Sequence, residues 1–139
     1  MPVAASLLVS ASAAIVAVLG ALHLFYTFQG DKLHPREPAT LRAMEQSGLV
    51  LTRQTTVWRA WIGFNASHSF GPIMFGLIYA YLALKAPAPL FGSPLLCGLG
   101  LVLLIGWVVL SRLYFFRVPY RSMVAATTIY IAGLVAAAF

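Results

Sequence analysis

The stretch FNASHSFG, residues 64–71, runs directly into GPIMFGLIYAYLAL, residues 71–84. The second part is apolar enough to lie in lipid, whereas the first places Asn65 and His68, with two serines, within about two helical turns. An inert anchor would not carry these side chains, because a polar or ionisable group in hydrocarbon costs free energy. The stretch therefore predicts a membrane-spanning helix with a polar face.

The composition of the whole chain agrees with a membrane protein. Its 139 residues are 61% hydrophobic and 9% charged, with a mean hydropathy of +0.90, whereas soluble domains carry about 25% charged residues. Such a chain cannot cover itself with a polar surface, so we expect one integral membrane domain over residues 1–139. The net charge of +6 does not indicate nucleic-acid binding, because no basic helix or aromatic–basic alternation faces water.

Four segments are long enough to cross a bilayer, which takes about 20 apolar residues: 4–28, 57–84, 93–111 and 121–139. The first has no Lys or Arg before it and exceeds the core of about 7–15 residues in a signal peptide, so we expect it to be retained. The predicted fold class is an all-α integral membrane protein, a four-helix transmembrane bundle.

Three connections join these spans. The first, residues 29–56, holds all three acids, and its segment PATLRAMEQSG (38–48) predicts a short interfacial helix. The second, residues 85–94, is short and Pro-rich, which favours a tight turn between antiparallel helices. The third, SRLYFFRVPYRS (111–122), is short and basic.

The basic residues predict an orientation. Eight of the nine Lys and Arg lie in or beside the first and third connections, and Lys85 alone lies on the opposite side. The positive-inside rule makes the crowded side cytoplasmic, so both termini are expected on the non-cytoplasmic side. We expect a multi-pass protein of a bacterial inner membrane.

The second span carries two stripes at helical spacing. Asn65 and His68 share a face with Pro72, Phe75 and Tyr79, because positions three and four apart are neighbours on a helix. Asn65 and His68 either bond to other helices and hold the bundle together, or face a polar pocket, and both readings stay open.

The other stripe of the second span consists of small residues. Gly63, Ser67 and Gly71 recur every four positions, a spacing that lets a neighbouring helix approach the backbone closely. We therefore expect this stripe to contact another helix.

Two histidines in different spans raise the question of a metal or haem. His68 is expected about 15 Å inside the cytoplasmic border and His23 about 8 Å from its helix end, so their depths differ. Two His without Cys or carboxylate partners are a weak metal pattern. We predict no metal site and do not favour a haem.

The third connection gathers guanidinium and hydroxyl groups. It contains Arg112, Tyr114, Arg117, Tyr120, Arg121 and Ser122. Such groups flank membrane spans for orientation alone, and this reading explains most basic loops. They also form anion sites that bind carboxylates or phosphates or stabilise a thiolate, with added potential from helix amides near Arg121.

These motifs carry a resemblance to a known family. RAWIGFNASHSFGPIMFGLIYAYLAL (59–84) and RVPYRS (117–122), with four spans and outside termini, resemble the membrane-associated proteins in eicosanoid and glutathione metabolism. That family includes microsomal glutathione transferases and prostaglandin E synthase. The resemblance covers residues 57–139, and it implies a homotrimer that binds glutathione and acts on a lipophilic substrate.

The resemblance also implies site residues. Arg121 and Ser122 match the family's Arg-Ser pair for thiolate activation and would be catalytic. The co-substrate would be bound by Arg59, Asn65, His68, Arg112, Tyr114 and Arg117. The lipophilic substrate would lie along Phe75, Tyr79 and Tyr120.

The sequence departs from the family at two positions. His68 stands where the family has the Glu that engages glutathione, and Trp61 stands where it has an Arg. A histidine cannot make the same charged contact with an ammonium group, but it can accept another anion or act as a general base.

The sequence therefore supports three hypotheses of function. The first is a small membrane enzyme of the glutathione-transferase type, with a thiol or other anionic co-substrate and a lipophilic substrate from the bilayer. The second is a non-catalytic subunit of a larger membrane complex, with its polar stripe buried against other chains. The third is a module that binds lipid, quinone or haem through His23 and His68.

Overall fold

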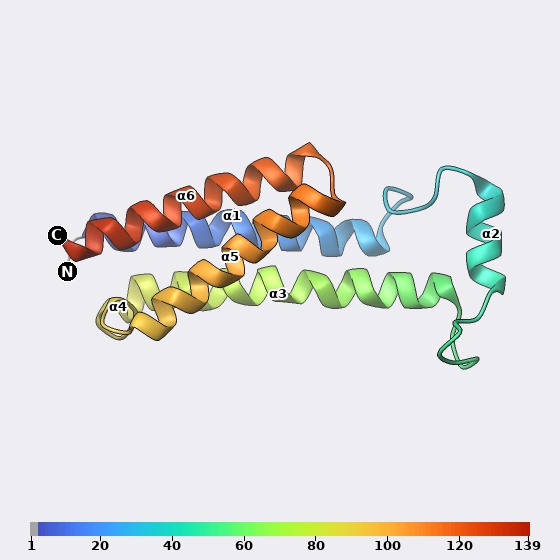
Figure 1. Ribbon diagram of the computed structural model, residues 1–139, viewed down its shortest axis with the longest axis horizontal. Coiled ribbons are helices and arrows are strands. Elements are labelled where there is room, and N and C mark those ends of the chain that lie inside the picture. Colours follow the sequence, from blue (N-terminus) through green and yellow to red (C-terminus); the bar gives the residue numbers. More distant parts are fainter. Residues whose placement is uncertain (1–2) are drawn as a thin grey trace. The chain divides into compact units, whose positions relative to one another are not determined.

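The computed structural model describes residues 3–139, and these form six helices (Figure 1). Four are long and apolar enough to span a membrane: α1 (Val3–Phe28), α3 (Val57–Lys85), α5 (Pro94–Tyr114) and α6 (Arg117–Ala138). The other two are α2 (Pro38–Gln46) and α4 (Pro87–Phe91). Within these residues the only β-pairing is an isolated bridge between Gly48 and Thr56. The prediction of a helical, multi-pass membrane protein is confirmed.

The chain divides into two compact units. One, which we call the core unit, comprises the chain up to Leu19 together with Pro72–Phe139. The other, the loop unit, comprises Gly20–Gly71. The first unit contains parts of all four long helices, and the second contains the end of α1, the helix α2 and the beginning of α3.

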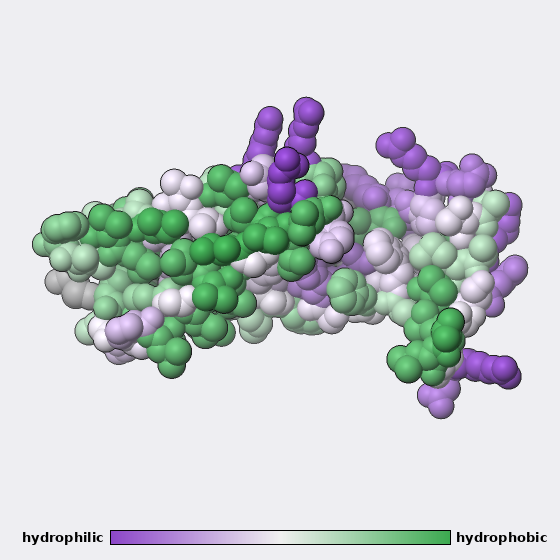
Figure 2. Space-filling view, in the orientation of Figure 1, coloured by the Kyte–Doolittle hydropathy of each residue, from purple (hydrophilic) through white to green (hydrophobic). Residues whose placement is uncertain are grey.

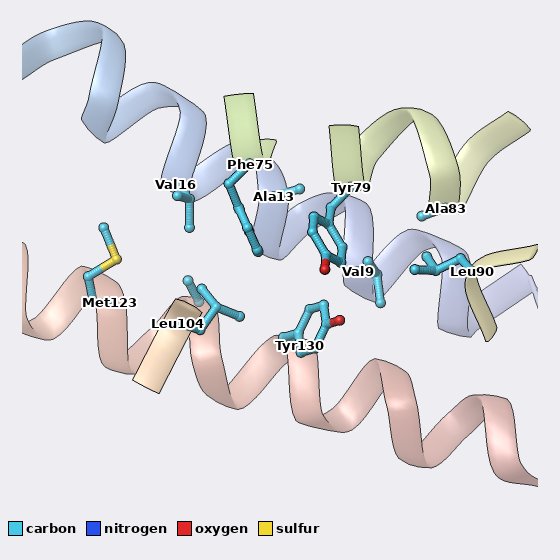
Figure 3. Packing of buried hydrophobic residues seen from close by; sticks show 11 residues of the cluster. Val9, Ala13, Val16, Phe75, Tyr79, Ala83, Leu90, Leu104, Met123 and Tyr130 are labelled. Atoms are coloured by element: carbon cyan, nitrogen blue, oxygen red, sulfur yellow. The ribbon is translucent and has the colours of Figure 1, made fainter. Parts of the chain in front are cut away.

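Aromatic and small side chains fill the centre of the core unit (Figure 3). The ring of Phe75 stacks on that of Tyr79 at 4.5 Å and meets Trp107 edge-on at 5.4 Å. Around them pack residues of α1, α4, α5 and α6, namely Val9, Ala13, Val16, Leu90, Leu104, Met123, Ala126 and Tyr130. Every spanning helix thus contributes to one cluster.

Polar side chains in the core unit bond to carbonyl oxygens of other helices. Ser12 Oγ on α1 donates to the Ala126 oxygen of α6 at 2.8 Å. The hydroxyl of Tyr79 donates to the Leu96 oxygen at 2.7 Å, and that of Tyr130 donates to the next carbonyl, Cys97, at 3.1 Å. These bonds satisfy groups that would otherwise be buried without partners in a bilayer.

Two connections differ in detail from the sequence-based expectation. α6 begins at Arg117 instead of residue 121, because Pro119 is compatible with the first turn of a helix and does not delay it. Only Phe115 and Phe116 separate α5 from α6. The expected tight turn before α5 contains the short helix α4, and Ser93 then caps α5 by accepting a bond from the Leu96 amide at 3.3 Å.

The expected contact stripe on α3 is wrong for this chain. Gly63 has no described atom within 4 Å of the place where a Cβ would stand, and Ser67 and Gly71 are exposed. Gly76 makes the close approach instead, because a Cβ there would collide with the Ala17 side chain and lie 2.6 Å from the Ala13 oxygen. The buried face of α3 carries large side chains such as Phe75 and Tyr79, and the residues of the small-residue stripe are exposed.

We expect Gly76→Ala to destabilise the protein by about 1–3 kcal/mol, since the added methyl forces α1 and α3 apart. Gly106→Ala is the matched control, because a Cβ at Gly106 meets nothing within 4 Å and alanine favours helix formation. Thermal unfolding in detergent measures both. Equal melting temperatures for the two variants would contradict the close contact at Gly76.

Candidate functional site

The loop unit brings two histidines of different helices into contact. The His23 ring on α1 and the His68 ring on α3 lie edge to face, with centroids 5.7 Å apart and planes at 86°. His23 Nε2 lies 3.0 Å from Asn65 Oδ1, one turn before His68 on α3. His23, Asn65 and His68 together are called the His–Asn–His cluster below.

The expectation that the two histidines differ in depth is wrong. That expectation assumed that the end of α1 and the start of α3 lie at the same depth in the membrane. α3 begins about 12 Å before Asn65, whereas α1 ends only about 8 Å beyond His23. The first turn of α3 therefore extends past the end of α1, and the two imidazoles meet.

Hydrogen bonds fix the orientation of Asn65 and with it the tautomer of His23. The Asn65 amide nitrogen Nδ2 donates to the Trp61 carbonyl at 2.8 Å, so its Oδ1 is the atom that faces His23. A carbonyl oxygen can only accept, and His23 Nε2 must therefore carry the proton. In the neutral ring this leaves Nδ1 as the basic nitrogen.

The helices support this cluster through further side-chain bonds. Ser69 Oγ donates to the Asn65 carbonyl at 2.8 Å, and Thr27 Oγ1 donates to the His23 carbonyl at 2.8 Å. Asn65 is only 7% exposed, whereas His68 is half-buried. His23 is half-buried as well. Asn65 is therefore the buried centre of the cluster, and the two histidines are its more exposed members.

The cluster has an aromatic neighbour on α3. The Phe64 ring lies almost parallel to His68, at 6.2 Å and 6°. Among the described residues, 3–139, no three His, Cys, Asp or Glu side chains gather as metal ligands would. The cluster therefore places two imidazoles, which can form hydrogen bonds and transfer protons, beside the phenyl ring of Phe64.

The segment after α1 folds over the first turns of α3. Trp61 Nε1 donates to the Leu33 carbonyl at 3.1 Å, and the His34 ring meets Trp58 edge-on at 4.8 Å. A small apolar pocket forms there, lined by Leu33, His34, Pro35, Met44 and Trp61. Because Asn65 bonds to the carbonyl of Trp61, this pocket is one helical turn along α3 from the cluster.

The predicted basic residues of the core unit surround the connection between α5 and α6. Arg112 is in the last turn of α5, Arg117 begins α6, and Arg121 follows one turn later. All three are exposed, and hydrophilic side chains project around this connection in Figure 2. The guanidinium of Arg112 lies 5.7 Å from the centre of the Tyr120 ring.

The remaining predicted residues have diverse surroundings. Tyr114 is 74% exposed, and Ser122 is half-buried one position after Arg121. Arg59 is exposed on the first turn of α3, where its amide donates to Thr56 Oγ1 at 3.3 Å. Phe75 and Tyr79, predicted to line the substrate, are each 4% exposed and belong to the packed core.

The sequence points to Asn65 and His68 for the first hypothesis, and it includes His23 only in the third hypothesis, as a partner of His68 in a lipid, quinone or haem site. The signal was present, since His23 is an ionisable residue inside an apolar span and such residues face partners. Depths counted from the helix ends do not show that His23 and His68 meet. Trp61 was noted only as a departure from the family, and its carbonyl turns out to orient Asn65.

Comparisons with known proteins found no family model, no curated protein and no solved structure that matches this chain. The resemblance to the glutathione and eicosanoid family therefore stays a prediction that rests on the motifs quoted above.

We expect Asn65→Ala to destabilise the protein by about 1–3 kcal/mol, because His23 Nε2 and the Trp61 carbonyl both lose a partner in a half-buried place. Ser67→Ala is the control on the same helix, since Ser67 is exposed and bonds only to the carbonyl of Phe64. Melting temperatures in detergent compare the two. A loss no greater in Asn65→Ala than in Ser67→Ala would show that the His23–Asn65 bond is not formed.

Proposed function

We propose that this protein is a small membrane enzyme that takes a lipophilic molecule from the bilayer and transfers a proton at the His–Asn–His cluster. The observation that carries the proposal is the contact between two imidazoles and one oriented amide inside two membrane helices. Ionisable groups at such positions are costly and typically mark substrate or proton pathways.

The three residues of the cluster have different roles in this proposal. Asn65 holds His23 in the tautomer with the proton on Nε2. His68, half-buried beside it, meets the polar head of the ligand and accepts or donates the proton there, because an imidazole serves as acid or base near neutral pH. The His23 ring packs against the His68 ring at a nearly perpendicular angle and holds it in place.

The surroundings of His68 favour an apolar ligand body with a polar head. Phe64 and Phe70, on either side of His68 in the sequence, are 67% and 56% exposed. Exposed aromatic side chains on a membrane-spanning helix face lipid, so a ligand that reaches His68 from the bilayer would pass apolar contacts first. A carbonyl or hydroxyl head group would then find a hydrogen-bonding partner at His68.

A second candidate function is the glutathione-transferase type that the resemblance implies. It is supported by the composition of the core unit, which contains Arg112, Arg117 and Arg121 but no Asp or Glu. Exposed guanidinium groups without carboxylate partners attract soluble anions. In this candidate Arg121 stabilises the thiolate of a thiol co-substrate, Ser122 donates a hydrogen bond, and the protein is a homotrimer.

The orientation in the membrane belongs to the same proposal. Eight of nine basic residues lie in or beside the connections after α1 and after α5, which the positive-inside rule makes cytoplasmic. We infer a bacterial inner-membrane protein with both termini on the non-cytoplasmic side. Obligatory co-purification with another chain would favour a non-catalytic subunit instead.

Binding of a lipophilic ligand at His68 is testable with a benzoquinone that carries a decyl tail, since its carbonyl groups accept hydrogen bonds. We expect it to raise the melting temperature of the wild-type protein, because a ligand at about 100 times its Kd stabilises the native state by about 2.7 kcal/mol. His68→Phe should lose the shift, and Ser67→Ala should keep it. A shift of equal size in His68→Phe would place the ligand elsewhere.

The thiol candidate is tested with millimolar glutathione in the same detergent. We expect a higher melting temperature in the wild type that Arg121→Ala abolishes, because the guanidinium stabilises the thiolate. Arg53→Ala removes one exposed positive charge in the loop unit and serves as the control. The absence of any shift, or a shift that survives in Arg121→Ala, would remove glutathione from the proposal.

A further inference from the structure

The loop unit contains a closed turn between α2 and α3. At its base the Val57 amide donates to the Ser47 carbonyl at 2.9 Å, and Gly48 pairs with Thr56 in an isolated bridge. Within the turn the Thr52 amide donates to the Leu49 carbonyl at 3.2 Å. The turn is therefore an ordered structure with a defined tip at residues 49–51.

Two aliphatic side chains at the tip are exposed. Val50 is fully exposed and Leu51 is 91% exposed, although both are strongly hydrophobic. Exposed Arg53 and Gln54 follow after Thr52. Figure 2 shows this hydrophobic projection with hydrophilic side chains at its edge. Burial of these two aliphatic side chains in an apolar environment is favourable, so the tip suits contact with lipid.

The position of the turn brings it close to the bilayer surface. α3 is a candidate membrane span that begins at Val57, and Trp58 and Trp61 in its first turns are typical of the membrane–water interface. Leu51 lies six positions before Val57, so it is within about 22 Å of the start of this helix. In Figure 1 the turn projects to the side of α3 and does not continue its axis.

We propose that residues 49–51 are a membrane anchor of the first connection. Leu49, Val50 and Leu51 insert into the boundary between head groups and acyl chains, and Arg53 meets lipid phosphates. This anchor is independent of the His–Asn–His cluster and of any reaction there. It holds the turn, and with it the start of α3, at the bilayer surface.

Size and charge favour lipid over a protein partner. Each partner in a stable protein interface buries about 800 Å² of its surface. The surface of three aliphatic side chains is much smaller than that. Shallow insertion into a bilayer needs no such area, because each CH₂ group that enters the acyl region contributes on its own. The adjacent basic residue, Arg53, suits anionic phosphates, and no acidic residue follows Glu45 in the sequence.

A spin label at Val50 tests the anchor in the full-length protein. Val50→Cys is labelled in a Cys97→Ser background, since Cys97 is the only cysteine, and reconstituted into vesicles of zwitterionic and anionic phospholipids. Gln46→Cys, exposed on α2, is the control. Collision rates with oxygen, which concentrates in lipid, and with a water-soluble nickel chelate are measured for both labels.

We expect the label at Val50 to collide several-fold more with oxygen relative to nickel than the label at Gln46, and we expect Arg53→Ala to reduce this ratio in anionic vesicles. Equal ratios at the two positions would place the tip in water and overturn the proposal. Protection of Val50 from both reagents would also overturn it, because it would show that another protein copy covers the tip.

Discussion

Hydrocarbon offers no hydrogen bonds, and this constraint organises the whole molecule. A polar side chain on a spanning helix gains free energy by finding a partner within the protein, and among the buried polar side-chain atoms of the described residues only Ser10 Oγ lacks one. In the core unit Ser12, Tyr79 and Tyr130 each donate to a carbonyl of another helix or of a helix start. In the loop unit Asn65 uses both ends of its amide, one toward His23 and one toward its own helix. The same requirement that fixes the packing also orients the candidate site.

Most of the architecture was predictable because apolar length is a strong signal. Three of the four spans agree with the structure within three residues at each end, and the interfacial helix ends within two residues of the expected Gly48. The start of α6 was missed because Pro119 resembles a break, although proline is tolerated in a first turn. The small-residue stripe failed for a different reason: spacing alone does not give the rotation of a helix, which Phe75 and Tyr79 determine by facing inward.

The candidate site was predictable in its residue types and not in its pairing. Asn65 and His68 stand out because both are polar within an apolar span. Their partner His23 lies 42 positions from Asn65 in the sequence. The two rings meet because α3 begins beyond the end of α1, and the sequence does not show this offset. The basic residues around α6 were equally visible, but their arrangement depends on a connection of two residues that the sequence did not reveal. Long-range geometry therefore limits sequence reasoning more than chemistry does.

The shortness of that connection bears on how the protein is made. Only Phe115 and Phe116 lie between α5 and α6. This connection is too short for the two helices to insert into the bilayer far apart from each other. We expect them to enter the membrane as one hairpin after α1 and α3 have been synthesised. The hydroxyl of Tyr130 then finds the Cys97 carbonyl across the same hairpin, so α6 brings with it the bond that closes the pair. We therefore expect the last stage of biogenesis to be the joint insertion of α5 and α6.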